Sequence, residues 1–136
     1  MSGKQKHITL GIAVLVCIVL MSDAGQAAAA KLKWYEGGTL HKRPALEWQK
    51  ASYNNKLATC ADFVAHAWIN KMLNKKVSKQ IHVVDDLKPF AVELVAFIDA
   101  ATAPEKDPQK NRELFANQTV AELAARGMAM LSWMEK

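Results

Sequence analysis

Cysteine is scarce in this sequence, which has two in 136 residues, Cys17 and Cys60. Cys17 lies in an apolar run that has the features of an export signal, so the chain left after its removal would keep Cys60 alone. An internal disulfide would then be impossible, and a lone cysteine in an exported protein either pairs with another chain or stays buried. The chain must therefore fold on an apolar core of its own.

Signatures of the common catalytic and metal sites are also missing from the sequence. It contains no H-x-x-x-H, C-x-x-C or G-x-S-x-G pattern and no glycine loop of the kind that binds phosphate. The only adjacent acidic pair, Asp85 and Asp86, is explained by a helix N-terminus, where negative charge is favourable. We therefore expect a protein that is not an enzyme, with no catalytic residue, cofactor or metal.

The first thirty residues have the composition of a targeting signal. Lys4 and Lys6 precede an uncharged run over residues 8–21, which the alanine-rich stretch SDAGQAAAA follows. A run of this length suits the apolar region of a secretory signal, roughly 7–15 residues, and is short for a membrane span of about 20. We predict cleavage after Ala27 or Ala30, with an uncleaved anchor as the alternative. The alanine-rich junction favours a bacterial protein exported to the periplasm.

Residues 31–136 contain the helix-start signals expected of a small helical bundle. The one β-branched cluster, QIHVV at 80–84, is too short to build a sheet. The expected fold is therefore all-α, a periplasmic single domain of four to five helices behind a cleaved signal peptide of residues 1–30. The helices are predicted at 44–51, at 53–74 after Ser52, from Asp85 or Asp86 to 101, near 109–116 after Asp107, and from 120 on, after the capping box of Thr119 and Glu122.

Three of these helices carry an apolar stripe with the period of an α-helix. The stripe of the first long helix is predicted to extend to Met72, and that of the last helix to Met134. Gly127 interrupts the last stripe and costs about 1 kcal/mol of helix propensity relative to alanine. It marks either the close approach of a neighbouring helix or a kink. The three stripes are expected to bury one another.

Cysteine, an acid and a histidine follow closely in the stretch KLATCADFVAHAW, at Cys60, Asp62 and His66. Six residues of helix separate the cysteine from the histidine, so their side chains diverge by about 120° and do not form a catalytic pair. We expect Cys60 to be a buried, unactivated thiol, although a pair with His41 or His82 stays open. Asp62 and His66 are four residues apart, a spacing that allows a weak ion pair, but we expect both to be solvated surface residues.

Part of the same stretch, TCADFVA, resembles the T-C-x-D-F-aliphatic start of small periplasmic acid-stress chaperones of the HdeA type. Those proteins are also short, helical and exported. The resemblance covers seven residues and implies a chaperone that exposes its helix faces under acid stress. The chain departs from that pattern because, once the predicted signal with Cys17 is removed, Cys60 has no second cysteine with which to close the disulfide of those chaperones.

Four lysines form a basic run, Lys71, Lys75, Lys76 and Lys79, with no acidic residue between positions 63 and 84. Positive charge near the end of a helix complements the helix dipole, and such runs are often only solvated. The functional alternative is a surface that binds an acidic protein or an anionic envelope surface. These lysines are candidate partner-binding residues.

Aromatic residues stand ahead of the predicted bundle, with Trp34 and Tyr35 before a Gly-Gly turn and Trp48 on the first short helix. Such residues either fold back over the core or act as anchors in an interface, where Trp and Tyr are enriched. Trp34 and Tyr35 are therefore also candidate partner-binding residues.

Methionines gather near the C-terminus, where Met128, Met130 and Met134 surround Trp133. Thioethers are ligands for Cu(I), and Met130 and Met134 are spaced by one helical turn. Packing is the alternative, since methionine fills irregular gaps between helices.

The expected function is that of a non-enzymatic periplasmic protein that binds another envelope protein, as an accessory or inhibitor-like module. An acid-type stress chaperone and a methionine-based copper-binding protein are the alternatives. From residue 31 on there are sixteen basic and twelve acidic residues, a net charge of +4. This mild excess and the predicted export argue against a nucleic-acid partner. We expect no transmembrane span once the signal is removed.

Overall fold

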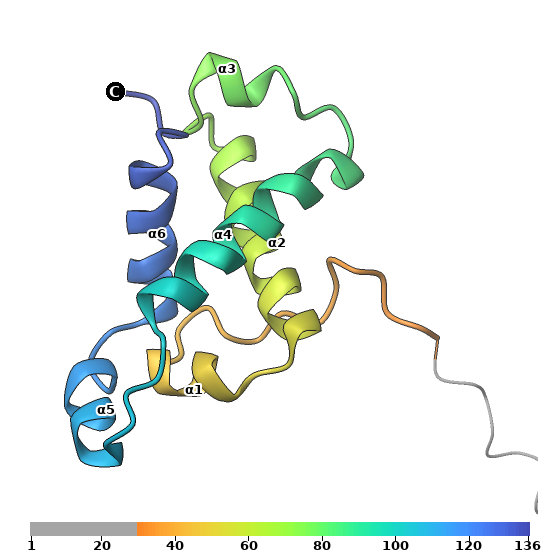
Figure 1. The fold of residues 1–136 in the computed structure, drawn as a ribbon. Helices are drawn as coiled ribbons and strands as arrows, with labels where there is room; N and C mark the ends of the chain where they lie inside the picture. The colour runs from red at the N-terminus through yellow and green to blue at the C-terminus, as the bar shows by residue number, and fades with distance from the viewer. Residues whose placement is uncertain (1–29) are drawn as a thin grey trace, which may run out of the picture. The chain divides into compact units, whose positions relative to one another are not determined.

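The computed structural model describes residues 30–136, and Leu32–Lys136 pack together as one unit (Figure 1). The predicted signal peptide, residues 1–30, lies outside the described residues except for Ala30. The predicted all-α class is confirmed, because residues 30–136 contain α-helices and no strand. The elements of this range are α1 (Ala45–Lys50), α2 (Tyr53–Ile69), α3 (Lys75–Ser78), the 3-10 helix η1 (Val84–Leu87), α4 (Lys88–Ala101), α5 (Pro108–Phe115) and α6 (Val120–Met130).

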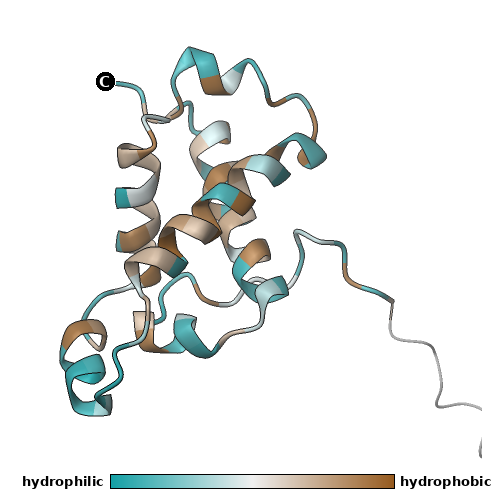
Figure 2. Cartoon of the chain, viewed as in Figure 1, coloured by the Kyte–Doolittle hydropathy of each residue, from teal (hydrophilic) through white to brown (hydrophobic). Residues whose placement is uncertain are grey.

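Helix α4 lies between α2 and α6 and contacts both of them, with α1 and α5 packed together at one end of the fold and α3 at the other (Figure 1). Apolar residues gather where the three longer helices face one another, whereas α5 is largely hydrophilic (Figure 2). Each large apolar side chain buried in this way contributes about 1.5–3 kcal/mol. The buried residues include Leu57, Cys60 and Val64 of α2, Ala91, Leu94 and Ile98 of α4, and Val120, Leu123 and Ala124 of α6.

Gly127 marks the closest packing of α6 on α4. A Cβ atom built at this position would lie 2.7 Å from Cδ1 of Phe97 and 2.8 Å from Cδ1 of Leu94. Carbon atoms do not approach so closely, so the glycine permits the two helices to come together. The close approach predicted from the sequence is confirmed.

Several helix starts follow the prediction. The hydroxyl of Ser52 accepts a hydrogen bond from the N–H of Asn55, at the start of α2. At the start of α6, the Thr119 hydroxyl accepts from the N–H of Glu122, and the Glu122 carboxylate accepts from the N–H of Thr119. This second bond lowers the pKa of Glu122. The predicted capping box is confirmed.

The start of α4 differs from the prediction of an Asp85 or Asp86 cap. The α-helix begins at Lys88, and the 3-10 helix η1 precedes it. The Asp86 carboxylate accepts from the N–H groups of His82 and Val83, at 2.8 and 3.0 Å, and these bonds lower its pKa. Asp86 therefore fixes the entry of η1 rather than that of α4.

The helix predicted over 53–74 was too long, since α2 ends at Ile69. The chain turns there in a Schellman motif, in which Lys71 takes a left-handed conformation with φ of 57°. Its N–H donates to the carbonyl of Trp68, and the N–H of Met72 donates to that of Ala67 at 2.8 Å. Met72 consequently does not extend the apolar stripe and is 40% exposed. The short helix α3 after this turn brings the described α-helices to six, against the four to five predicted.

Helix α6 ends in the same way, so the predicted extension of its stripe to Met134 was also wrong. Ser132 is left-handed, with φ of 60°, and the N–H of Trp133 donates to the carbonyl of Met128 at 3.0 Å. The helix stops at Met130. Met130 and Met134 are therefore not one helical turn apart, and the spacing on which the copper alternative depended is absent.

The tails that follow α2 and α6 pair with each other. The N–H of Asn74 donates to the carbonyl of Trp133, and the N–H of Glu135 donates to the carbonyl of Met72, both at 2.8 Å. The Asn74 side chain adds a bond from its Nδ2 to the carbonyl of Ser132 and caps α3 through Oδ1. This pairing holds α3 beside the end of α6. None of the helices in residues 30–136 is long and apolar enough to span a membrane.

Candidate partner-binding site

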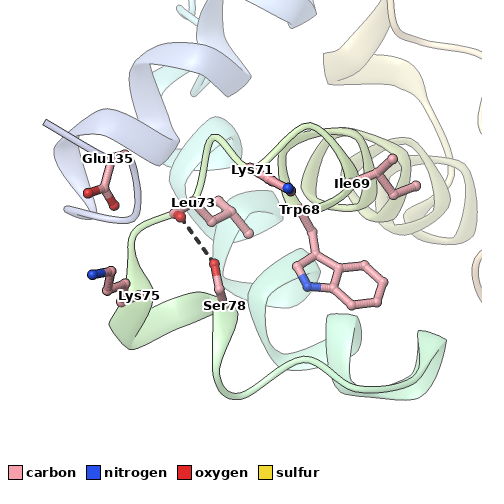
Figure 3. Close-up of a pocket in the computed structure, with 7 residues that line it drawn as sticks. All are labelled: Trp68, Ile69, Lys71, Leu73, Lys75, Ser78 and Glu135. Carbon is pink, nitrogen blue, oxygen red and sulfur yellow. Dashed lines mark hydrogen bonds between the residues drawn. The ribbon is translucent and has the colours of Figure 1, made fainter.

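A hollow of about 610 Å³ lies where the end of α2, the helix α3 and the C-terminal tail meet (Figure 3). The turn at Lys71 creates it, because the chain leaves the axis of α2 there and returns as α3. The residues that line the hollow are Trp68, Ile69, Lys71, Leu73, Lys75, Ser78 and Glu135.

Apolar side chains form part of the wall. Leu73 is buried, and Trp68 is half-buried against the core. Ile69, by contrast, is 71% exposed, which is the largest exposure among the large apolar residues of the described chain. Large apolar side chains that face solvent beside a concave surface are typical of binding sites.

Lysines surround this apolar wall. Lys71 and Lys75 line the hollow, whereas Lys76 and Lys79 are exposed on α3 and its C-cap, outside the lining. Within residues 30–136, no carboxylate lies within 4.0 Å of any of the four ammonium groups. Glu135 is the acidic residue of the lining (Figure 3). The hollow therefore combines an apolar wall with positive charge that its own carboxylates do not pair.

The backbone of Leu73 also contributes to the wall. Leu73 forms an antiparallel bridge with Met134 in which the neighbouring residues make the hydrogen bonds, so its own N–H and C=O point away from the C-terminal tail. On that side the Ser78 hydroxyl donates to the Leu73 carbonyl at 3.0 Å (Figure 3). No acceptor for the Leu73 N–H is found in the described part of the chain.

Trp34 and Tyr35 do not line the hollow. The Trp34 indole N–H donates to Oδ1 of Asp85 at 2.9 Å, and the Lys88 ammonium lies 5.6 Å from the centre of its ring. Both aromatic rings pack against the core and meet edge to face at 5.4 Å. The structure thus separates the two aromatic candidates from Lys71 and Lys75, and their contacts favour the alternative in which they cover the core.

Cys60 is buried in the core and free. Burial raises the pKa of its thiol far above the usual range, and the negative charge of Asp99 adds to this effect. His41 is not its partner, because its Nε2 lies 2.8 Å from Oδ2 of Asp62. The thiol is therefore not an activated nucleophile, as predicted.

The ion pair that helix spacing allows between Asp62 and His66 does not form, and both residues are exposed, as expected. Asp62 pairs with His41 of the N-terminal segment, and His66 contacts the side chain of Asn70 at 3.3 Å. Helix spacing permitted the pair but did not account for a segment that packs across α2. A helical wheel cannot predict such a partner, because it compares only residues of the same helix.

The TCADFVA stretch binds this N-terminal segment. The Leu40 N–H donates to the buried Thr59 hydroxyl, and the His41 ring packs edge to face on Phe63 at 5.3 Å. At Gly38 the two backbones nearly touch, since a Cβ there would lie 2.7 Å from the Thr59 nitrogen. The polar and aromatic members of the stretch therefore hold residues 38–41 on α2.

No group of three or more His, Cys, Asp or Glu residues in positions 30–136 is placed to hold a metal ion. The C-terminal methionines are dispersed, since Met128 is buried and Met130 is 69% exposed on the surface of α6. Trp133 packs in the core edge to face with Phe90 at 5.3 Å. These positions favour the packing alternative for this segment.

No family model matches the chain, no curated protein is significantly similar to it, and no solved structure is significantly similar in fold. Its function must therefore be inferred from the chemistry of its surfaces.

Sequence reasoning identified Lys71 and Lys75 but missed the apolar partners of these lysines. Trp68 has the helical spacing of the apolar stripe that was expected to be buried, and Leu73 lies inside the continuous helix predicted over 53–74. One signal for the break was present, because Asn74 precedes α3 in a position where asparagine often caps a new helix. The left-handed turn had no such signal, since glycine is the usual residue there and lysine occupies it.

Proposed function

We propose that this protein is an exported, non-enzymatic domain that binds another protein of the bacterial envelope. The observation that carries the proposal is the surface at the end of α2. There, exposed Ile69 and half-buried Trp68 lie beside lysines that no carboxylate of residues 30–136 pairs. Tryptophan is enriched in interface hot spots, and positively charged lysines around a concave surface provide electrostatic complementarity to an acidic partner. The proposal that the protein is exported rests on the uncharged run of residues 8–21 and on the alanine-rich stretch after it.

Two features support binding rather than catalysis. The most reactive side-chain type in the described chain, the Cys60 thiol, is buried with a raised pKa. The hollow is lined by lysines and one glutamate, without a histidine, cysteine or paired acids that would act as an acid and a base. Its chemistry suits charge recognition.

The proposal is tested by affinity capture from a periplasmic extract. Wild-type protein is compared with a Lys71→Glu/Lys75→Glu variant and with a Lys42→Glu/Lys106→Glu variant. The control variant changes the net charge equally at exposed lysines outside the hollow. We expect an identifiable envelope protein that binds wild type and the control, and whose binding is lost with the first variant. Equal capture by all three proteins, or no specific capture, would contradict the proposal.

An acid-type stress chaperone is a second candidate, which the attachment of the N-terminal segment favours. Carboxylates hold this segment at two points, Asp62 to His41 and Asp85 to the Trp34 indole. Both contacts depend on a carboxylate, and strong acid weakens contacts of this type. A chaperone of this kind should bind a hydrophobic dye near pH 3, roughly one unit below the usual aspartate pKa, and suppress aggregation of a denatured client there. A protein that stays folded and binds no dye at this pH excludes it.

A further inference from the structure

We propose that the hollow binds an extended acidic segment of a protein, in which a carboxylate side chain adjoins a large apolar one. This inference rests on the proposed function and names the chemistry of the partner. The proposed ligand is a peptide and not a lipid headgroup.

The apolar half of the ligand is set by the wall of the hollow. Trp68 and Ile69 come from the last turn of α2, and the buried Leu73 lies beyond the turn (Figure 3). A hollow of about 610 Å³ has room for one or two large side chains. An aromatic or branched aliphatic side chain placed there would cover the exposed surface of Ile69 and gain the free energy of apolar burial.

The carboxylate half is set by three lining residues: Lys71 and Lys75, and Leu73, whose N–H has no acceptor in residues 30–136. A carboxylate oxygen accepts from all of these groups, and hydrogen bonds that involve an ionised partner are stronger than neutral ones. The Ser78 hydroxyl donates to the Leu73 carbonyl, whereas the Leu73 N–H has no acceptor in residues 30–136, so the donor is the group at this edge that needs a partner. It therefore selects an acceptor in the ligand.

The shape and the remaining charge favour a peptide over a membrane surface. The lysine and leucine donors lie around a concavity, whereas a bilayer presents a flat plane of headgroups. Glu135 also lines the hollow, and its negative charge would repel a uniformly anionic surface. A single extended segment can place its carboxylate near Lys71, which lies apart from Glu135 in the hollow (Figure 3).

Lys71 is the specificity-determining residue of this site. Its left-handed backbone conformation, with φ of 57°, is one that glycine adopts more readily than lysine. Replacing it with glycine therefore removes the charge without opposing the turn. Ser132 has the corresponding position at the end of α6, with φ of 60°, and does not line the hollow. Ser132→Gly is thus a matched control that makes the same backbone change elsewhere.

The test is a titration of the purified, isotope-labelled protein followed by backbone amide NMR. The probe is a short end-blocked peptide in which a phenylalanine stands between a glutamate and an aspartate. Its control peptides carry glutamine and asparagine in place of the acids, or alanine in place of phenylalanine. We expect amide shifts confined to residues 68–78 and the C-terminal tail, including the Leu73 amide. The uncharged peptide should bind about tenfold more weakly, the loss expected from one charge-assisted hydrogen bond. The alanine peptide should bind at least about tenfold more weakly, because it loses the apolar burial of the phenylalanine.

The protein variants complete the test. Lys71→Gly should weaken binding about tenfold without lowering the melting temperature, and Ser132→Gly should leave binding unchanged. The inference is overturned if Lys71→Gly binds as wild type does, if the uncharged peptide binds equally well, or if millimolar peptide shifts none of these amides. It is also overturned if phosphatidylglycerol vesicles shift the amides of the hollow and the acidic peptide does not.

Failure of this inference differs from failure of the proposed function. An envelope protein that is captured through Lys71 and Lys75 while the acidic peptide fails to bind would retain the docking function and reject the peptide chemistry. Peptide binding without any specific envelope partner would reject the docking function and retain the chemistry of the hollow.

Discussion

The C-terminal ends of α2 and α6 use the same backbone turn and serve different purposes. Both helices end in a Schellman motif with a residue other than glycine in the left-handed position, Lys71 in one and Ser132 in the other. The residue that follows the turn differs. After α6 it is the buried Trp133, and after α2 it is Met72, which is 40% exposed.

The difference shows that the same turn can place the following side chain either in the core or at the surface. Trp133 fills the space beside Phe90 and thereby completes the packing of α6 on α4. The turn after α2 directs Met72 partly into solvent, leaves Ile69 exposed and leads into the lysines of α3. A buried side chain after the turn stabilises the fold, whereas an exposed one leaves the surface available to a partner.

The largest expected effect comes from truncating the residues that follow the two turns. Trp133→Ala removes a buried aromatic side chain and should lower the free energy of unfolding by about 3–5 kcal/mol. Met72→Ala should lower it by less than about 1 kcal/mol, because the methionine is already partly in water. Urea unfolding followed by circular dichroism measures both. Similar losses at the two sites would show that the ends are energetically alike.

A smaller effect is expected at Asn74, which joins the two ends. Its side chain caps α3 and donates to the Ser132 carbonyl, so Asn74→Ala should cost about 1–2 kcal/mol. Ser52→Ala, at the cap of α2, removes a cap without a bond to another tail and should cost about 1 kcal/mol. Thermal melts of the two variants compare them. An Asn74 variant that is the more stable of the pair would mean that the tail bond contributes nothing.

The positions one turn before each helix end should also respond unequally. Gly127→Ala forces a methyl group against Phe97 and Leu94, at an overpacking cost of about 2 kcal/mol. A gain in helix propensity of about 1 kcal/mol offsets part of this cost, so a net loss of about 1 kcal/mol is expected. His66→Ala, on the exposed face of α2, should stay within about 0.5 kcal/mol of wild type. A stabilised Gly127 variant in denaturant titrations would mean that the two helices can separate freely.

The smallest effect concerns the left-handed residues themselves. Lys71→Gly and Ser132→Gly should each stabilise the protein by about 0.5 kcal/mol, because the relief of left-handed strain slightly exceeds the greater entropy of glycine in the unfolded chain. Differential scanning calorimetry of the two variants beside wild type measures the gain. A loss at Lys71 with a gain at Ser132 would reveal an intramolecular contact of the lysine that stabilises the turn.

The candidate site was only partly predictable from the sequence. The basic run was visible because no acidic residue interrupts positions 63–84. Its apolar partners were not, because Trp68 has the spacing of a core residue and is half-buried against the core. Trp68 borders the candidate site because the chain turns at Lys71, and a helical wheel drawn as far as position 74 leaves this turn out.

The all-α class, the apolar stripes, the capping box of Thr119 and Glu122 and the burial of Cys60 followed from the sequence alone. Each depends on residues a few positions apart, where helix geometry and local hydrogen bonds decide the outcome. The partner of Asp62, the ends of α2 and α6 and the hollow between them were decided by tertiary structure. Each of these depends on a segment distant in the sequence: residues 38–41 cross α2 to reach Asp62, and the C-terminal tail pairs with residues 72–74. Two left-handed turns at lysine and serine persist because the paired tails and the buried Trp133 compensate for their local cost.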